Sequence, residues 1–143
     1  TPIKNVDILL KAGEILKNSW NKAFVITLIG PTSTEEDKQY KKELEQFVQT
    51  RGLQDLVQFR GSVPYKEIHK EYWEADVVVN LCPTGGIDKM VVEGMAAGNI
   101  TVVSNETFRP LFGPYAEVLI YPYQNADILA EKIKELFKAQ NKK

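Results

Sequence analysis

The sequence has few of the residues on which several classes of protein depend. Its 143 residues include one cysteine, Cys82, and one histidine, His69. A single thiol cannot close a disulfide within the chain, and no His, Cys and carboxylate residues recur at the spacing of a metal site. We therefore expect no disulfide framework and no metal ion, and a reducing cytoplasm suits the composition best.

The sequence also lacks an excess of charge of one sign and a long apolar run. Eighteen basic residues and nineteen acidic residues leave a formal net charge of -1, which argues against a broad nucleic-acid surface. The longest apolar runs, such as Phe24 to Ile29, have the length of a strand, whereas a bilayer needs ~20 residues. We expect a soluble protein in which any phosphate is bound locally.

An initiator methionine and a secretory segment are absent as well, since the chain begins at Thr1. A chain of this length is typical of one domain, which buries roughly 68 to 70% of its unfolded surface. We expect residues 1–143 to be one domain of a longer protein.

Strand-like and helix-like patterns alternate along the chain. Apolar residues at the period of one helical face predict helices over residues 5–18, 33–51, 65–73, 89–97 and 127–139. Runs of β-favouring residues predict strands over residues 24–29, 57–60, 75–81, 100–103 and 118–120. Alternation of this kind favours βαβ units with right-handed crossovers, and hence an α/β, Rossmann-like, doubly wound parallel sheet with helices on both faces.

Two helices carry more detailed expectations. Ser33 and Glu36 have the spacing of a capping box, which predicts that the second helix begins there, and Gly52 is expected to end it. In the third helix, Tyr65, Tyr72 and Trp73 are expected to pack in the core and against neighbouring helices.

Ligands of open α/β sheets bind outside the carboxyl ends of the strands. The loops that follow the predicted strands contain glycine together with small hydroxyl or amide groups. The candidate loops for binding are Gly30 to Ser33, Gly61 to Val63, Pro83 to Asp88 and Ser104 to Glu106. Outside residues 83–88, the first candidates among them are Gly30, Gly61, Ser62 and Val63.

The segment from Thr84 to Glu93 is the strongest candidate site. Gly85 and Gly86 allow the main chain to approach a ligand closely, and the free N–H groups of the following helix point the same way. Lys89 lies in the first helical turn, where the helix dipole disfavours a cation. A bound phosphate would explain these choices.

Glu93 is a carboxylate within an apolar helical run, and Gly94 beside it weakens the helix by up to ~1 kcal/mol relative to alanine. If Asp88 is the N-cap, Glu93 lies roughly 7 Å along the axis at ~1.5 Å per residue. A ribose joined to a diphosphate at the helix tip could reach that far. Its two vicinal hydroxyls would match the two carboxylate oxygens.

The same residues also have a purely structural interpretation. The two glycines can form an ordinary loop, Asp88 can be only an N-cap, and Lys89 with Glu93 can be an exposed i,i+4 pair. The Asp88 carboxylate would repel phosphate unless Lys89 offsets it. On these residues alone both interpretations stay open.

The run from Gly86 to Gly98, followed by the strand at residues 100–103 and by Ser104, resembles the nucleotide-sugar-binding segment of retaining GT-B glycosyltransferases, in the large group called family 4. The similarity covers nearly the whole chain. Residues 4–12 are similar to the start of that family's donor domain, residues 24–30 to its next strand, and residues 57–63 to its strand and base-binding loop. These motifs occur in the family's order and spacing.

The resemblance implies the C-terminal, donor-binding half of an enzyme with two Rossmann-like domains, whose N-terminal acceptor domain is absent from this chain. Lys4 matches the lysine that contacts the diphosphate, and Glu93 matches the carboxylate that holds the ribose. The base would lie near Arg60 to Val63. The phosphate and sugar contacts would come from Thr84, Gly85, Gly86, Ile87, Asp88 and Lys89.

The reaction implied is transfer of a hexose-type sugar from a UDP-, GDP- or ADP-linked donor to a hydroxyl of a sugar or lipid-linked acceptor, with retention and without a metal or other cofactor. Such an enzyme would serve polysaccharide biosynthesis in the cytoplasm, with the full-length protein peripheral at the membrane. The alternatives are half of a GT-B-like sugar-nucleotide epimerase and a non-enzymatic α/β interaction domain.

Two positions depart from the family's pattern. The glutamate usually found eight residues before Glu93 is replaced by Gly85, although the pair Asp88-Lys89 occurs in a subset of the family. A diphosphate-binding arginine would precede Lys4, beyond the start of the chain. We therefore expect donor binding, but no sugar transfer by the isolated domain.

Overall fold

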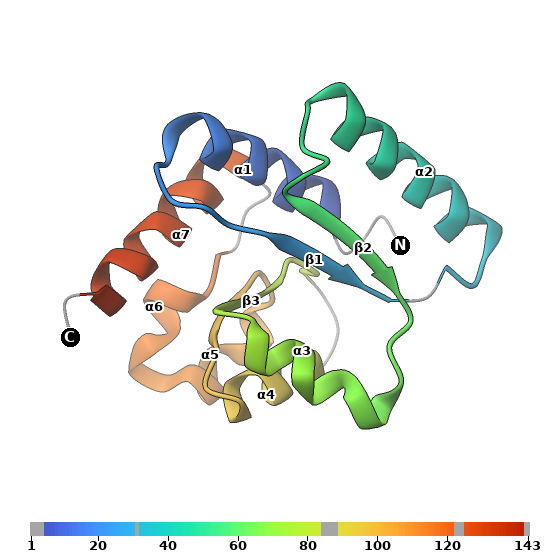
Figure 1. The fold of residues 1–143 in the computed structure, drawn as a ribbon. Helices are drawn as coiled ribbons and strands as arrows, with labels where there is room; N and C mark the ends of the chain where they lie inside the picture. Colours follow the sequence, from blue (N-terminus) through green and yellow to red (C-terminus); the bar gives the residue numbers. More distant parts are fainter. Residues whose placement is uncertain (1–4, 31, 84–88, 122–124, 142–143) are drawn as a thin grey trace. The chain divides into compact units, whose positions relative to one another are not determined.

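A computed structural model describes residues 5–30, 32–83, 89–121 and 125–141 (Figure 1). These residues form two compact units. The first unit contains residues 6–62 and 125–141, and the second contains Asn5 and residues 63–121. None of the described helices is long and apolar enough to span a membrane.

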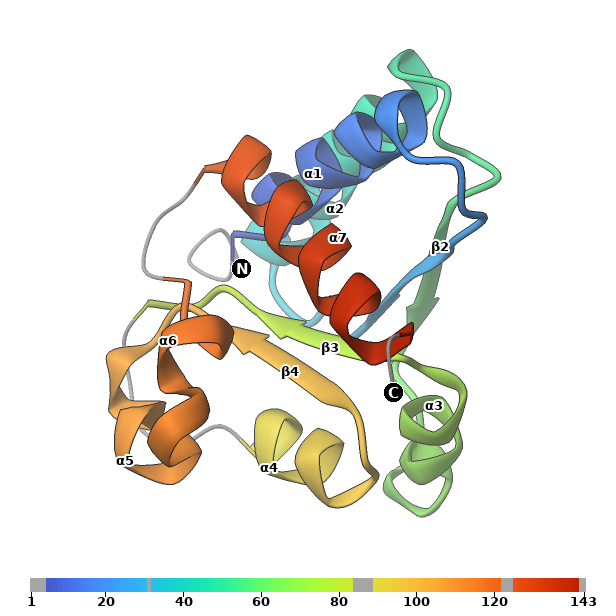
Figure 2. The same cartoon turned by 90° about the vertical axis from the view of Figure 1, so that its left-hand side faces the viewer.

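The first unit contains a parallel pair of strands and three helices. Strand β1 (Ile26–Ile29) pairs with β2 (Val57–Gly61). The helices are α1 (Val6–Ser19), α2 (Glu35–Thr50) and α7 (Ala126–Asn141), and α1 lies beside α7 (Figure 2). The predicted helices and strands of this unit are therefore confirmed, with small shifts at their ends.

One core cluster of the first unit comes from the apolar faces of α1 and α2 and from the segment that leads into β2. Its buried members are Leu10, Leu44, Val48, Leu53 and Val57. A second contact joins distant parts of the sequence, because the ring of Trp20 lies 6.1 Å from that of Phe24 and 5.4 Å from that of Phe137. The contact between Trp20 and Phe137 ties the end of α1 to α7.

Helix α2 begins one residue later than the capping-box pattern predicts. The N-cap is Thr34, whose Oγ1 accepts a hydrogen bond of 3.0 Å from the backbone N–H of Asp37. The prediction of Ser33 with Glu36 was wrong because Thr34 with Asp37 has the same spacing and chemistry. Sequence alone does not separate these two overlapping caps.

The second unit also contains a parallel pair of strands. Strand β3 (Val77–Asn80) pairs with β4 (Ile100–Val103), and α4 (Lys89–Ala96) packs against both. Before β3 the chain forms the 3-10 turn η2 (Tyr65–Glu67) and α3 (Ile68–Glu74). After β4 it forms η3 (Glu106–Phe108), α5 (Arg109–Phe112), η4 (Gly113–Tyr115) and α6 (Ala116–Leu119).

The strand predicted at residues 118–120 is instead the end of a short helix. Helix α6 continues to Leu119, and only Ile120 bridges β4, parallel to Val103. The helical turn places Ala116 and Ile120, four residues apart, in one buried cluster and leaves Val118 50% exposed. An extended chain would have placed all three on one side.

Two aromatic residues near α3 are exposed rather than packed. Tyr65 is 82% exposed and Trp73 is 69% exposed, so the packing predicted for them was wrong. Trp73 instead meets the ring of His69, one helical turn earlier, edge to face at 4.7 Å between centroids. The period of α3 thus places these rings on its outer face.

Gly94 sets the distance between α4 and the second unit's strands. A Cβ atom at residue 94 would lie 2.9 Å from Cγ2 and 3.3 Å from Cβ of Val78, and 3.5 Å from Cγ2 of Thr101. Those separations are shorter than normal van der Waals contact for Val78. Glycine therefore allows the helix to lie directly on β3 and β4.

We expect Gly94→Ala to lower the free energy of unfolding by about 1–3 kcal/mol, because overpacking outweighs the better helix propensity of alanine. Urea denaturation followed by circular dichroism measures this change. Adding Val78→Ala removes the methyl groups that clash, so the double variant should regain part of the loss.

Gly13→Ala in α1 is a matched control. The nearest atom to a Cβ there is Cδ1 of Ile26 at 2.7 Å, the end of a flexible side chain that can rotate away. We expect a smaller loss than at Gly94. Equal losses at the two glycines, or strictly additive effects of Gly94→Ala and Val78→Ala, would contradict the explanation.

Candidate functional site

The carboxyl ends of β3 and β4 lie level at one edge of the second unit's sheet. Asn80 is opposite Val103, and the N–H of Ser104 donates to the carbonyl of Asn80 at 3.0 Å. The Asn80 side chain then turns the chain, since its Oδ1 accepts from the N–H of Cys82 at 3.0 Å. The segments after both strands therefore leave from the same edge, where α/β sheets bind ligands.

Asn5 lies at the same edge. Nδ2 of Asn5 donates a hydrogen bond of 3.0 Å to the carbonyl oxygen of Leu81, which directly follows β3. Lys4, the predicted diphosphate contact, lies outside the described residues, and its role stays a prediction. Its neighbour Asn5 is nevertheless tied to the edge that the sequence analysis selected.

Helix α4 contributes the two charged side chains predicted for the site. Lys89 is exposed in its first turn, and Glu93 is half-buried one turn later. Within the part of the chain that the structure describes, neither side chain forms a hydrogen bond or an ion pair. The structural interpretation of these residues as an i,i+4 ion pair is therefore wrong.

Gly94, by contrast, has a structural explanation. The sequence analysis counted it as an unfavourable choice that suggested a ligand. Its contact with Val78 shows that packing requires a glycine at this position. Gly94 thus positions α4 but is no evidence of binding.

The predicted loop residues of the first unit lie at the carboxyl edge of β1 and β2. The N–H of Gly30 donates to the carbonyl of Gly61 at 2.8 Å. Leu28 is opposite Phe59 and Ile29 is opposite Gly61, so Arg60 is an extra residue in β2. Gly61 has a φ of 69°, a left-handed conformation that glycine adopts without strain.

The remaining predicted residues are partly outside the described chain. Ser62 is exposed directly after β2, and Val63 is half-buried in the second unit. The loop residues outside the described ranges are Thr84, Gly85, Gly86, Ile87 and Asp88. Their binding roles stay predictions.

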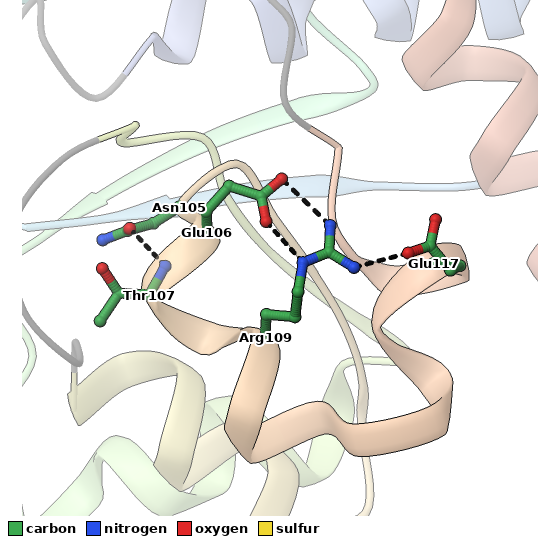
Figure 3. A network of polar contacts seen from close by, with 5 residues as sticks. All are labelled: Asn105, Glu106, Thr107, Arg109 and Glu117. Atoms are coloured by element: carbon green, nitrogen blue, oxygen red, sulfur yellow. Dashed lines mark hydrogen bonds and ion pairs between the residues drawn. The ribbon is translucent and has the colours of Figure 1, made fainter.

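The candidate loop from Ser104 to Glu106 forms a polar network beside the carboxyl end of β4, which the sequence analysis did not predict. Asn105 is 6% exposed, and its Oδ1 accepts from the N–H of Thr107 at 2.9 Å, which caps η3. Arg109 donates to Glu106 at 2.8 and 3.2 Å and to Glu117 at 2.6 Å (Figure 3). The i,i+3 spacing of Glu106 and Arg109 could have indicated their ion pair from the sequence. The bond from Arg109 to Glu117, eight residues further on, has no such local pattern.

This network connects the two ends of the segment between β4 and Ile120. The hydrogen bonds from Arg109 lower the pKa of Glu106, and the two carboxylates raise the pKa of Arg109 above its usual range. All three side chains are at least 45% exposed, so water and salt screen the pairs. Asn105, which is buried, is the stronger anchor of this segment.

Within the described ranges, no three His, Cys, Asp or Glu residues group together in a way that could hold a metal ion. Among the described residues, the distinctive groups on α4 are the Glu93 carboxylate, which has no partner there, and the exposed Lys89 ammonium group in the first turn.

The family of the chain is shown by a direct comparison. The model of the family described as glycosyl transferases group 1 matches residues 1–143. The chain belongs to this family. Its described strands and helices form the Rossmann-like α/β fold found in the C-terminal domains of GT-B glycosyltransferases.

Three solved structures show the same fold. The C-terminal domain of LpcC, a glycosyl transferase group 1 family protein from Francisella tularensis, is 23% identical with a TM-score of 0.83, over 96% of this chain and 71% of that one. HepE from Anabaena in complex with UDP-glucose is 22% identical with a TM-score of 0.84, over 99% of this chain and 38% of that one. HepE in complex with UDP and glucose is 21% identical with a TM-score of 0.83, over 99% and 37%.

This glycosyl transferases group 1 domain thus spans well under half of the HepE chain. A search of curated proteins gave no significant match.

We expect Asn105→Ala to lower the free energy of unfolding by about 1–3 kcal/mol, because it removes a buried cap and leaves its partner without an acceptor. Arg109→Ala removes hydrogen bonds to Glu106 and Glu117 but should cost less, since those bonds are exposed. Urea denaturation of both variants tests this order. A greater loss for Arg109→Ala would mean that the ion pairs, not Asn105, hold the segment.

Proposed function

We propose that this domain binds a nucleoside-diphosphate sugar as the donor domain of a retaining glycosyltransferase, which transfers a hexose-type sugar to an acceptor hydroxyl. The observation that carries the proposal is the Glu93 carboxylate, half-buried and without a hydrogen-bond partner among the described residues. It lies on the helix that follows the carboxyl edge of β3. Membership of the glycosyl transferases group 1 family supports sugar transfer as the reaction.

A partly desolvated carboxylate gains free energy from hydrogen-bond donors that a ligand brings. The two vicinal hydroxyls of a ribose are such donors and match its two oxygens. Lys89 precedes Glu93 by four residues, or ~6 Å along a helix at ~1.5 Å per residue. A nucleotide with its ribose at Glu93 would therefore bring its phosphates toward the start of α4.

The diphosphate would be stabilised by positive charge and by backbone N–H groups. We assign these roles to Lys4, to Lys89 and to the backbone from Thr84 to Asp88, on the basis of the family resemblance. The same groups would stabilise the diphosphate as it leaves during transfer, when its negative charge grows. This is electrostatic catalysis by fixed donors, and the proposal requires no metal or other cofactor.

The remaining parts of the proposal also follow the family. Gly30, Gly61, Ser62 and Val63 are assigned to the donor, with the base nearest to Gly61 and its neighbours. The HepE complexes with UDP and UDP-glucose support a nucleotide sugar as the ligand class and make UDP the first probe. An acceptor-binding domain elsewhere in a longer cytoplasmic protein, associated with the membrane surface, would provide the sugar or lipid-linked acceptor.

Calorimetric titration with UDP, GDP and ADP tests donor binding. We expect at least one of them to bind, and Glu93→Gln to weaken it by about 10- to 100-fold, because a charge-assisted hydrogen-bond pair is lost. Glu74→Gln, an exposed glutamate at the end of α3, is the matched control and should leave the affinity unchanged. Absence of binding at millimolar nucleotide, or equal affinity of the Glu93→Gln variant, would refute the proposal.

Deoxy nucleotides separate a ribose contact from a general effect of charge. With 2′,3′-dideoxy-UDP, or the corresponding form of the nucleotide that binds best, the wild type and Glu93→Gln should have similar affinities. A Glu93→Gln effect that persists without the hydroxyls would place Glu93 elsewhere in the mechanism.

The isolated domain should not transfer sugar. With UDP-glucose and a panel of sugar acceptors, no UDP release above the buffer rate is expected from a coupled assay, because nothing in the proposed site binds the acceptor. Turnover by these 143 residues would overturn the need for a second domain.

A further inference from the structure

Two exposed aromatic side chains lie on the outer side of α3 and of the turn before it. Tyr65 and Trp73 are the most exposed of the large apolar and aromatic side chains among the described residues. The ring of His69, which is also exposed, meets that of Trp73 edge to face. Ile68 and Tyr72 are half-buried on the other side of α3, so the helix holds the three rings toward solvent.

Two lysines beside these rings have no partner among the described residues. Lys66 and Lys70 are exposed, and neither forms an ion pair there. In α2, by contrast, Nζ of Lys38 pairs with Glu35, three residues earlier, at 3.3 Å. Glu67 stands at the same spacing before Lys70, but these two side chains do not pair. The two ammonium groups are therefore available to an external anion.

The acidic side chains of α3 lie farther from the rings than Lys70 does. At ~100° per residue around the helix axis, Trp73 is ~60° from Lys70. Glu74 and Glu71 are ~100° and ~160° from Trp73 on the same basis. The outer side of the segment thus has one surface of rings and cations, which we call the aromatic-basic face. Its members are Tyr65, Lys66, His69, Lys70 and Trp73.

Helix α3 lies at the amino ends of the second unit's strands. It ends at Glu74, and β3 begins at Val77. Nδ2 of Asn99, the residue before β4, donates to the carbonyl of Tyr72 at 2.9 Å and so ties α3 to the start of that strand. The candidate donor site is at the carboxyl ends of β3 and β4. A partner on the aromatic-basic face would therefore leave the donor edge open.

We infer that the aromatic-basic face binds the surface of an anionic lipid bilayer. Tyrosine and tryptophan are favoured at such a surface, because the ring enters the headgroup region while its O–H or N–H stays hydrated. Lysines beside them attract anionic headgroups and bury only their methylene stems. An apolar protein surface would instead leave both ammonium groups without a counter-charge. The inference rests on the membrane association included in the proposed function, for which it supplies the contact surface, but it does not require donor binding.

Co-sedimentation with vesicles of phosphatidylcholine, with and without phosphatidylglycerol, tests the inference. We expect the chain to bind the vesicles that contain phosphatidylglycerol, and salt to weaken this binding by screening. Lys66→Gln/Lys70→Gln should weaken it about 10- to 30-fold, since each lysine near an anionic surface contributes about fivefold. Trp73→Ala should weaken it about tenfold, because a large ring no longer leaves water.

Each variant has a matched control elsewhere in the chain. Lys38→Gln/Lys42→Gln removes the same charge, from exposed lysines at the same spacing, in α2 of the first unit. Tyr115→Ala removes an exposed ring from η4. Both controls should bind phosphatidylglycerol vesicles much as the wild type does.

The fluorescence of Trp73 reports its own insertion. The chain has two tryptophans, and the other, Trp20, packs against Phe24 and Phe137. Trp20→Phe therefore leaves Trp73 as the single tryptophan. Its emission should shift to shorter wavelength when phosphatidylglycerol vesicles are added, because the exposed indole ring leaves water.

Three results would overturn the inference. They are failure of the folded wild type to bind phosphatidylglycerol vesicles, equal losses from the lysine pairs of α2 and of the aromatic-basic face, and unchanged Trp73 emission in vesicle-bound Trp20→Phe. Sedimentation velocity without vesicles tests a second copy of the chain as the occupant. A dimer that Trp73→Ala dissociates would also overturn the inference.

UDP titration separates this inference from the proposed donor site. Trp73→Ala and added vesicles should leave the UDP affinity unchanged, because the aromatic-basic face and the donor edge are at opposite ends of β3. Nucleotide binding without vesicle binding would refute only the membrane surface. Vesicle binding without binding of UDP, GDP or ADP would refute the donor site and leave this inference standing.

Discussion

The close contact between Gly94 of α4 and Val78 of β3 is the constraint on which the second unit depends. Without a Cβ at residue 94 the helix lies directly on the strands, and Val91 on the same helix joins a cluster with Val103 and Phe108 in which each is at most 1% exposed. Gly94 therefore sets how deeply α4 lies on the sheet. That depth places Lys89 at the exposed start of the helix and Glu93 at the border of its buried face.

The position of Glu93 follows from its neighbour. Successive residues of a helix are ~100° apart around the axis at 3.6 residues per turn, so a residue beside the tightly packed Gly94 is half-buried rather than fully exposed. Full burial would have required a partner for the carboxylate within the protein, and full exposure would have left water to satisfy it. The intermediate position leaves the Glu93 carboxylate partly desolvated and without a partner among the described residues.

The residues proposed to contact the donor, and the contacts that hold the second unit together, come from several separate parts of the sequence. The groups proposed to contact the donor come from Lys4, from the loops after β1 and β2, and from α4 with the residues before it. Asn5 bonds to Leu81 across 76 positions, and Val78 meets Gly94 across a strand end and a loop.

The sequence by itself determined the alternation of helices and parallel strands, the loops at their carboxyl ends and the family, because periodicity, glycine positions and motif order are local. It could not separate the caps at Ser33 and Thr34, or recognise that residues 116–119 are helical. Only the tertiary structure decided that Gly94 serves packing, that Lys89 and Glu93 do not pair, and that Asn5 is tied to Leu81. Each of these depends on side chains that the fold brings together from distant positions or holds apart on one helix, which no local pattern records.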